Sequence, residues 1–307
     1  MKLDFVKLQG LGNDFIFIDD FSNEITLSKK QVAFLCDRHF GIGADGVILV
    51  RPSKHAECAA YMHYINSDGT LAQMCGNGVR CFAKFLVDRG FVQSSAGHFV
   101  ADTLSGPHPI SFNVDDNDRL TDATVDMGHP ILDPQEVPVD ASVNAHTSEG
   151  IGYVKELPID SPFGTFAFTC VSMGNPHAVC FLDSLDSLPS DLFTDQRIRS
   201  IATFDVNRVG SFFESHHLFP EKTNVEFVTV NDPTGISMRV FERGCGETLA
   251  CGTGTCATNV ALALTGRSGR CNDIHLRGGV LHIEWDTNDH VMMTGAAREV
   301  YEGSIVL

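Results

Sequence analysis

Apolar residues follow two spacings along the chain, and each spacing predicts a different kind of element. Short apolar runs between Gly, Asn, Asp and Pro turns are typical of β-strands. Such runs, singly or in short series, lie at residues 5–10, 15–18, 47–50, 59–65, 99–122, 166–171, 224–228, 236–241 and 281–307. A helical spacing at i, i+3, i+4 and i+7 is clearest in 79–86 and 257–264. Because strands are many and neighbour one another in sequence, the pattern favours an α+β fold with antiparallel sheets over a doubly wound parallel sheet.

Each of the two amphipathic segments begins with a cysteine and a Gly-x-Gly turn. The two starts are Cys75-Gly76-Asn77-Gly78 and Cys251-Gly252-Thr253-Gly254. Gly90 and Gly266 follow the segments, at the place where a glycine in the left-handed conformation commonly ends a helix. A helix start exposes unpaired backbone N–H groups and partial positive charge. We therefore predict that a cysteine at this position ionises more readily than one elsewhere.

Other landmarks recur in the same order ahead of the two cysteines. Asn66 ends a strand-like run nine residues before Cys75, and Glu242 ends one nine residues before Cys251. Each half also has an earlier Gly-Asn turn, within Leu11-Gly12-Asn13 and within Met173-Gly174-Asn175. Matched landmarks in one order predict two copies of one domain. If the two copies face each other, their cysteines, helix starts and asparagines share one cleft.

Length, charge and cysteine usage narrow the class of protein. The 307 residues suffice for two domains, and a formal net charge of -17 argues against nucleic acid or an anionic membrane as partner. The first residues lack the apolar run of a signal peptide, so we expect a soluble, cytoplasmic protein. In that compartment the ten cysteines are expected to be thiols. The nearest metal candidate, Cys245 with Cys251 and Cys256, lacks paired C-x-x-C or H-x-x-x-H partners, so we expect no metal.

Taken together, the motifs resemble those of the diaminopimelate epimerase family over nearly the whole chain. They are Leu11-Gly12-Asn13-Asp14-Phe15, Gly41-Ile42-Gly43-Ala44-Asp45-Gly46, Asn66-x-Asp68-Gly69, Cys75-Gly76-Asn77-Gly78-x-Arg80-Cys81, Met173-Gly174-Asn175-Pro176-His177, Asn224-x-Glu226-Phe227 and Glu242-Arg243-Gly244-x-Gly246-Glu247-Thr248-x-Ala250-Cys251-Gly252-Thr253-Gly254. The related proline racemases carry histidine, not asparagine, after the first Cys-Gly. They also lack the Glu-Arg-Gly sequence that precedes the second cysteine.

The resemblance implies a fold and an activity. The fold comprises two similar domains, each a strongly curved, mostly antiparallel sheet wrapped around a central helix, with the active site between them. We expect an N-terminal domain over 1–122, completed by 296–307, and a C-terminal domain over 123–295. The implied enzyme is a homodimer that needs no cofactor. It converts L,L-diaminopimelate to the meso form for lysine and cell-wall precursor synthesis.

The resemblance also assigns roles to residues. Cys75 and Cys251 are the catalytic pair, since inversion by proton exchange needs a base on one face of the carbon and an acid on the other. His177 and Glu242 match residues that assist the cysteines. The backbone donors of Gly76, Asn77, Gly252 and Thr253 are expected to hold the α-carboxylate, where charge builds as the proton leaves. The residues expected to bind the remaining polar groups of the substrate are Asn13, Asn66, Asn175, Asn224, Glu242 and Arg243.

Two other hypotheses remain open on the sequence. A racemase or isomerase of the same fold could act on another amino acid, such as a proline-like one; Arg243 argues against it, because a small apolar substrate would leave its guanidinium unpaired. A cysteine-rich metal or redox-sensing module is the non-enzymatic alternative. Stoichiometric zinc in the purified protein would favour that module.

Overall fold

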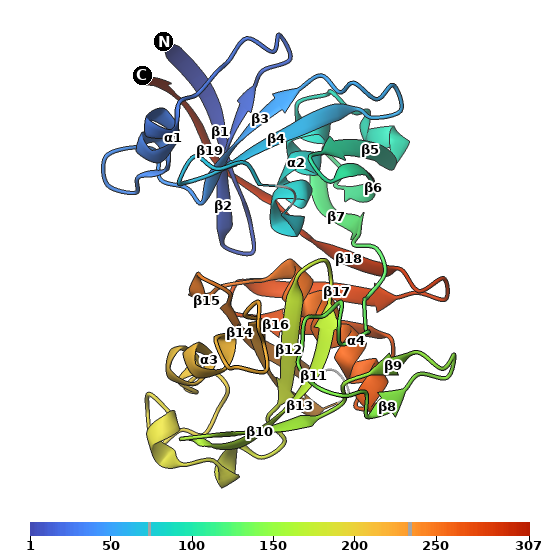
Figure 1. Cartoon of the computed structure of the whole chain (residues 1–307). Coiled ribbons are helices and arrows are strands. Elements are labelled where there is room, and N and C mark those ends of the chain that lie inside the picture. The colour runs from blue at the N-terminus through green and yellow to red at the C-terminus, as the bar shows by residue number, and fades with distance from the viewer. Residues whose placement is uncertain (73–74, 233–234) are drawn as a thin grey trace. The chain divides into compact units, whose positions relative to one another are not determined.

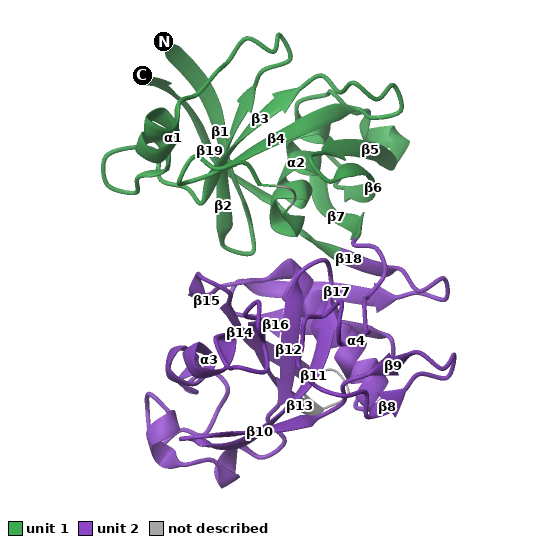
Figure 2. Ribbon diagram, in the orientation of Figure 1, with its two compact units in different colours: residues 1–126, 294–307 green, residues 127–293 purple. Residues whose placement is uncertain are grey.

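The computed structural model describes residues 1–72, 75–232 and 235–307, whose helices and strands are shown in Figure 1. They form two compact units (Figure 2): unit 1 is Met1–Asp126 with Thr294–Leu307, and unit 2 is Met127–Met293. These limits fall within a few residues of the boundaries expected from the sequence, at 122/123 and 295/296. No helix in the described part of the chain is long and apolar enough to cross a membrane.

Unit 1 is a sheet with two helices. Its strands are β1 (Lys2–Gly10), β2 (Asn13–Asp19), β3 (Gly46–Arg51), β4 (Ala60–Asn66), β5 (His98–Thr103), β6 (Gly106–Val114), β7 (Leu120–Asp126) and β19 (Arg298–Val306). They pair in the order β19-β1-β2-β3-β4-β5-β6-β7. Helix α1 (Lys29–Cys36) connects β2 to β3, α2 (Gly76–Asp88) lies between β4 and β5, and a 3₁₀ turn spans Ser94–Ala96. Ser28 and Gln31 form a capping box that starts α1.

Unit 2 has the same plan. Its main strands are β10 (Leu157–Ser161), β11 (Gly164–Ser172), β12 (Pro176–Phe181), β13 (Asn224–Asp232), β14 (Gly235–Glu242), β16 (Cys271–Leu276) and β17 (Gly279–Trp285), paired in that order. Helix α3 (Val206–Glu214) connects β12 to β13, and α4 (Gly252–Thr265) lies between β14 and β16. The smaller elements are β8 (Ala145–His146), β9 (Gly152–Tyr153), β15 (Gly246–Thr248) and 3₁₀ turns at Leu185–Ser187 and Ser190–Leu192. Strand β18 (Val291–Ala296) begins in unit 2 and ends in unit 1.

The strand order confirms that the chain contains two similar domains. The series β1-β2-α1-β3-β4-α2-β5-β6 of unit 1 corresponds to β11-β12-α3-β13-β14-α4-β16-β17 of unit 2. The expectation of antiparallel pairing is incomplete, however. Each unit contains two parallel steps, β2–β3 and β4–β5 in one and β12–β13 and β14–β16 in the other. Each parallel step follows a helix, because parallel neighbours need a crossover connection.

Helices α2 and α4 are the buried centre of their units. Every residue of α2 from Gly76 to Val87 is buried, as are nearly all residues of α4 up to Leu262. The helices end as the sequence predicts, with φ of 78° at Gly90 and 74° at Gly266. Such burial requires small residues where a helix meets the sheet. A carbon added to Gly78 would lie only 3.0 Å from Cε of Met62.

Buried cysteines contribute to both cores. Burial raises the pKa of Cys81 in unit 1, and of Cys170 and Cys180 in unit 2, to about 12. An unfolded thiol ionises with a pKa of about 8.5. The stabilising effect of each buried thiol is therefore complete below this pH and is lost as the pH rises toward the folded-state value.

This linkage predicts an alkaline loss of stability in unit 2. Between about pH 9 and 11, each buried thiol should lower the free energy of unfolding by about 1.4 kcal/mol per pH unit. Urea unfolding in reducing buffer, followed by fluorescence of the single tryptophan, Trp285, measures this slope. Cys170→Ala should reduce this slope by about 1.4 kcal/mol per pH unit, the contribution of one proton. Cys271→Ala, at an exposed thiol, should keep most of the wild-type slope. Equal slopes in wild type and Cys170→Ala would contradict the linkage.

Candidate active site

In unit 1, three strand ends meet beside the start of α2. Phe15 of β2 pairs with Gly46 of β3, which pairs with Asn66 of β4. The beginnings of β2 and β3 and the end of β4 therefore lie at one end of the sheet. Two predicted site residues, Asn13 and Asn66, lie at this end.

Cys75 contacts this end of the sheet through Asn13. The Cys75 Sγ lies 3.4 Å from Oδ1 of Asn13, and Nδ2 of Asn77 donates to the same oxygen at 3.4 Å. Asn77 accepts in turn, at 2.7 Å, from the fully buried guanidinium of Arg80. The Asn77 side chain thus holds the helix start in place. The contact predicted between Asn77 and the α-carboxylate uses the backbone N–H of this residue, and it stays a prediction.

A network of charged side chains fixes Asn13. The sequence did not predict that this network belongs to the site. The Asn13 Nδ2 donates to Asp45 at 2.5 Å, and Arg38 bridges Asp45 at 2.9 Å and Asp14 at 2.7 Å. Burial raises the pKa of Asp14, but hydrogen bonds and charge from Arg38 and Lys7 outweigh burial and hold this pKa below its ordinary value. Asp45 belongs to the glycine-rich motif 41–46, and this motif was the sequence feature that could have indicated its place in the site.

In unit 2, the equivalent strand ends meet beside the start of α4. His177 of β12 pairs with Asn224 of β13, and Val225 pairs with Phe241 of β14. Asn175 precedes β12, and Glu242 and Arg243 lie at the end of β14, so these predicted site residues share one end of the sheet. Asn66 of unit 1 and Glu242 of unit 2 end corresponding strands, as the matched landmarks predict.

Asn224 and Arg243 differ in how many of their side-chain hydrogen-bonding groups are already engaged. The buried Asn224 side chain donates to the Pro176 carbonyl at 2.8 Å and accepts from the backbone N–H of Arg243 at 2.9 Å. It therefore braces β12 against the turn after β14. The exposed Arg243 side chain donates through Nη1 to the Glu221 carbonyl at 3.0 Å. One such contact leaves most of its N–H donors for a ligand.

His177 is fully buried and bonded at both ring nitrogens. Its Nδ1 lies 2.6 Å from Oε1 of Glu226, and its Nε2 lies 3.1 Å from Oδ1 of Asn175. Glu226 belongs to the motif Asn224-x-Glu226-Phe227, from which no role was predicted for it. A carboxylate between the apolar residues Val225 and Phe227 was the signal, because a buried charge on a strand needs a partner.

The prediction that a helix start favours ionisation is wrong for Cys251. Burial is the largest cause that raises its pKa well above the ordinary value, and the carboxylates of Glu242 and Glu226 add to it. The Thr253 hydroxyl, 3.5 Å from the sulfur, and the Gly254 N–H act in the opposite direction but are weaker. Glu242 itself accepts a hydrogen bond from Thr248. Cys251 is thus held as a thiol.

Both helix starts retain donors for an anion. The first intrahelical bonds run from the N–H of Val79 to Cys75 and from that of Thr255 to Cys251. The earlier N–H groups have no intrahelical acceptor. They include those of the four residues predicted to bind the α-carboxylate: Gly76, Asn77, Gly252 and Thr253. The described residues contain no cluster of His, Cys, Asp or Glu suited to a metal, and Cys245, Cys251 and Cys256 form none.

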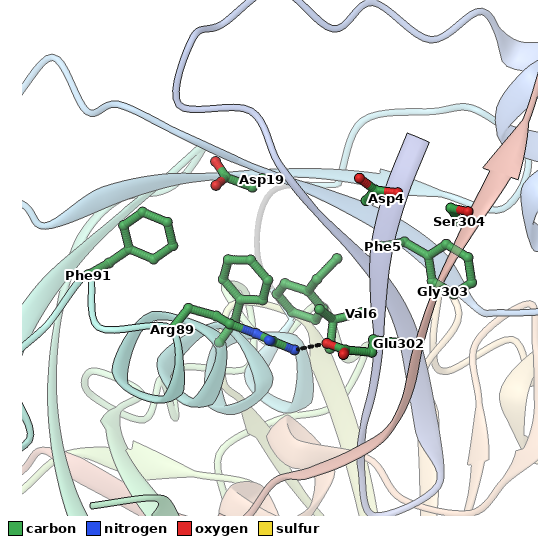
Figure 3. Close-up of a pocket in the computed structure, with 11 residues that line it drawn as sticks. Asp4, Phe5, Val6, Asp19, Arg89, Phe91, Glu302, Gly303 and Ser304 are labelled. Atoms are coloured by element: carbon green, nitrogen blue, oxygen red, sulfur yellow. Dashed lines mark hydrogen bonds and ion pairs between the residues drawn. The ribbon is translucent and has the colours of Figure 1, made fainter. Parts of the chain in front are cut away.

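A pocket in unit 1 is separate from the Cys75 site. It has a volume of about 710 Å³ and is lined by residues such as Phe85, Arg89 and Glu302 (Figure 3). Arg89 follows the last turn of α2, whereas Cys75 precedes the first. The 13 residues between them make a helix about 20 Å long, and none of the predicted site residues lines the pocket. The pocket is therefore not the candidate active site.

Comparison with known proteins agrees with the motifs and the topology. Among solved structures, a phenazine biosynthesis protein of the PhzF family from Bacillus anthracis matches 100% of both chains with a TM-score of 0.66 at 15% identity. A probable proline racemase from Agrobacterium radiobacter matches 99% of this chain and 93% of its own with a TM-score of 0.65 at 13% identity. These two structures establish the shared fold.

Sequence similarity is more specific. A diaminopimelate epimerase of Leptospira biflexa is 42% identical over 99% of both sequences. The family profile described as diaminopimelate epimerase matches residues 5–132 and 169–300, which include both cysteine motifs and both sets of strand ends. On this evidence the chain belongs to the diaminopimelate epimerase family.

Proposed function

We propose that the chain converts L,L-diaminopimelate to meso-diaminopimelate by proton exchange between Cys75, Cys251 and one α-carbon. The observation that carries the proposal is the matched placement of the two thiols. Each precedes a buried helix and lies beside the same set of strand ends in its own unit. In the proposed complex the two cysteines occupy opposite faces of the substrate carbon.

The different surroundings of the two thiols suit the two roles. Cys251, buried beside two carboxylates, holds a proton in the free enzyme and can deliver it to the substrate. Cys75 then acts as the base in the same turnover, with its sulfur positioned by Asn13. In the reverse direction the roles exchange. General acid–base catalysis of this kind contributes about 10²–10⁴-fold to the rate.

The helix starts stabilise the charge that develops during the reaction. Backbone N–H groups of Gly76, Asn77, Gly252 and Thr253 hold the α-carboxylate, which carries negative charge as the proton leaves. One such donor is worth roughly 2.7–4 kcal/mol of barrier. Arg243 binds the distal carboxylate, since its exposed guanidinium suits a forked contact. Asn13, Asn66, Asn175 and Glu242 complete the contacts to the substrate, and Asn224, predicted as a binding residue, instead holds the backbone of Arg243 in place.

The wider setting is part of the same proposal. The enzyme works without cofactor or metal in the cytoplasm, as a homodimer, in the synthesis of lysine and cell-wall precursors. Strand β19 supports the homodimer, because nearly all of its residues are exposed and they include Val300, Tyr301 and Val306. Exposed apolar side chains on one strand are typical of an interface. Light scattering in solution measures the oligomeric state directly.

The two-thiol mechanism predicts that neither cysteine is dispensable. Cys75→Ala and Cys251→Ala should each lower epimerisation of L,L-diaminopimelate by at least about 10³-fold, because one face of the carbon loses its proton carrier. The assay contains no added cofactor. Cys271→Ala, at an exposed cysteine, is the control and should keep wild-type activity. A Cys75→Ala enzyme with the wild-type rate would refute the mechanism.

The distal site predicts strong discrimination against lysine, which lacks only the second carboxylate. A site built for a polar group rejects an analogue without it by about 10⁴-fold, so kcat/KM for lysine should be lower than for diaminopimelate by that order. Arg243→Met should remove most activity on diaminopimelate without creating a lysine racemase. The control is Arg197→Met, at an arginine whose side chain is 88% exposed and paired with Asp195. Comparable values for the two substrates in wild type would instead favour a racemase of other amino acids.

A further inference from the structure

Glu226 is a buried carboxylate that the proposed mechanism does not use. It is completely buried on β13, and among the described residues its one ion pair is with His177 of the neighbouring strand β12. Its second oxygen, Oε2, is buried without a hydrogen-bond partner in the described part of the chain. Burial of a carboxylate carries a desolvation penalty that its partners must offset. It therefore calls for an explanation beyond packing.

The number of protons on the pair of His177 and Glu226 shows how its charge is balanced. The Nε2 of His177 faces Oδ1 of Asn175, which is an acceptor, so Nε2 carries a proton. The 2.6 Å contact between Nδ1 and Oε1 contains a second proton. With two protons the pair is neutral overall. With the shared proton on the imidazole, the carboxylate is the negative end of this pair.

That negative end is directed at the start of α4. A methyl carbon added to Gly254 would lie 2.6 Å from Oε1 of Glu226 and 3.3 Å from Sγ of Cys251. The carboxylate and the sulfur therefore lie on either side of the same small space. Only glycine fits this position, because any side chain would strike the carboxylate. Gly254 thus allows Glu226 to approach the sulfur.

We propose that Glu226 is a positioning residue for the proposed epimerisation: it keeps Cys251 protonated in the free enzyme and holds the His177 ring toward Asn175. The groups that face Cys251 are the carboxylates of Glu226 on β13 and Glu242 on β14, and the Thr253 hydroxyl on α4. His177 on β12 acts on the sulfur through Glu226. Glu226 is completely buried, and in this proposal it acts on the substrate only through Cys251 and His177.

The direct test measures Cys251 itself and needs no enzymatic activity, so it stands even if the proposed function fails. In a Cys75→Ala background, the rate at which iodoacetamide labels Cys251 is followed by mass spectrometry between pH 6 and 10. Glu226→Gln, which keeps the shape and removes the charge, should label Cys251 about tenfold faster near pH 7.5, which corresponds to a shift of one pH unit. The matched control is Glu247→Gln, at a carboxylate whose side chain is 6% exposed and paired with Arg239, which should leave the labelling profile unchanged.

Catalysis provides the second readout, which rests on the proposed function. The alkaline limb of kcat/KM for diaminopimelate should move to lower pH by about one unit in Glu226→Gln, with KM changed less than threefold. Glu226→Asp, which keeps the carboxylate, should restore most of the wild-type profile. Should Glu226→Gln fail to fold, Gly254→Ala replaces it: the added methyl pushes the carboxylate away, and faster labelling of Cys251 is again expected. A labelling profile of Cys251 that stays at its wild-type position in a folded Glu226→Gln or Gly254→Ala protein overturns the proposal.

Discussion

Burial of the two helix starts is the constraint on which the rest of the structure depends. A buried helix N-terminus leaves N–H groups that need an acceptor, and here each start also carries a cysteine. The fold brings three strand ends, with their polar side chains, to each helix start, and it leaves the first N–H groups there for an anion. Glycines at Gly78 and Gly254 permit the close approach, since an added carbon would lie 3.0 Å from Met62 Cε in one unit and 2.6 Å from Glu226 Oε1 in the other. The geometry that packs the helix is thus also the geometry that positions a thiol.

The two units share this plan but differ in the side chains described beside the sulfur. The contacts at the Cys75 helix start include the amides of Asn13 and Asn77, fixed by Asp45 and Arg80. At Cys251 the carboxylates of Glu242 and Glu226, together with burial, oppose ionisation. Duplication therefore accounts for the matched positions of the two thiols, and sequence divergence accounts for the carboxylates beside Cys251. In the proposed mechanism Cys251 begins as the acid and Cys75 as the base.

Local patterns predicted those parts of the site that depend on local physics. The helix starts at Cys75 and Cys251, the terminal glycines Gly90 and Gly266, and the matched strand ends at Asn66 and Glu242 all follow from short-range spacing. The parallel steps between strands could not be predicted in this way, because pairing across a helical crossover depends on distant segments. The surroundings of Cys251 were missed for the same reason. Glu226 approaches the sulfur from another strand, and its effect exceeds that of the helix start.

The same distinction applies to the asparagines. Asn13, Asn66, Asn175 and Asn224 were assigned to the polar groups of the substrate as one set, yet Asn224 is committed to a carbonyl and a backbone N–H. The Asn77 side chain is committed to Arg80, which leaves its backbone N–H for the contact assigned to it. Spacing identifies which residues gather at a site. Only the three-dimensional contacts separate those that brace it from those with free hydrogen-bonding capacity, such as Arg243.

The central claim is that two different thiols serve the two faces of one carbon. It is tested most directly by epimerising L,L-diaminopimelate in deuterated water and analysing both pools in early turnover. If one cysteine removes the proton and the other delivers a solvent-derived one, deuterium will enter the meso product much faster than the recovered L,L substrate. Equal labelling of substrate and product at low conversion would mean that a single group removes and returns the proton, and would contradict the account.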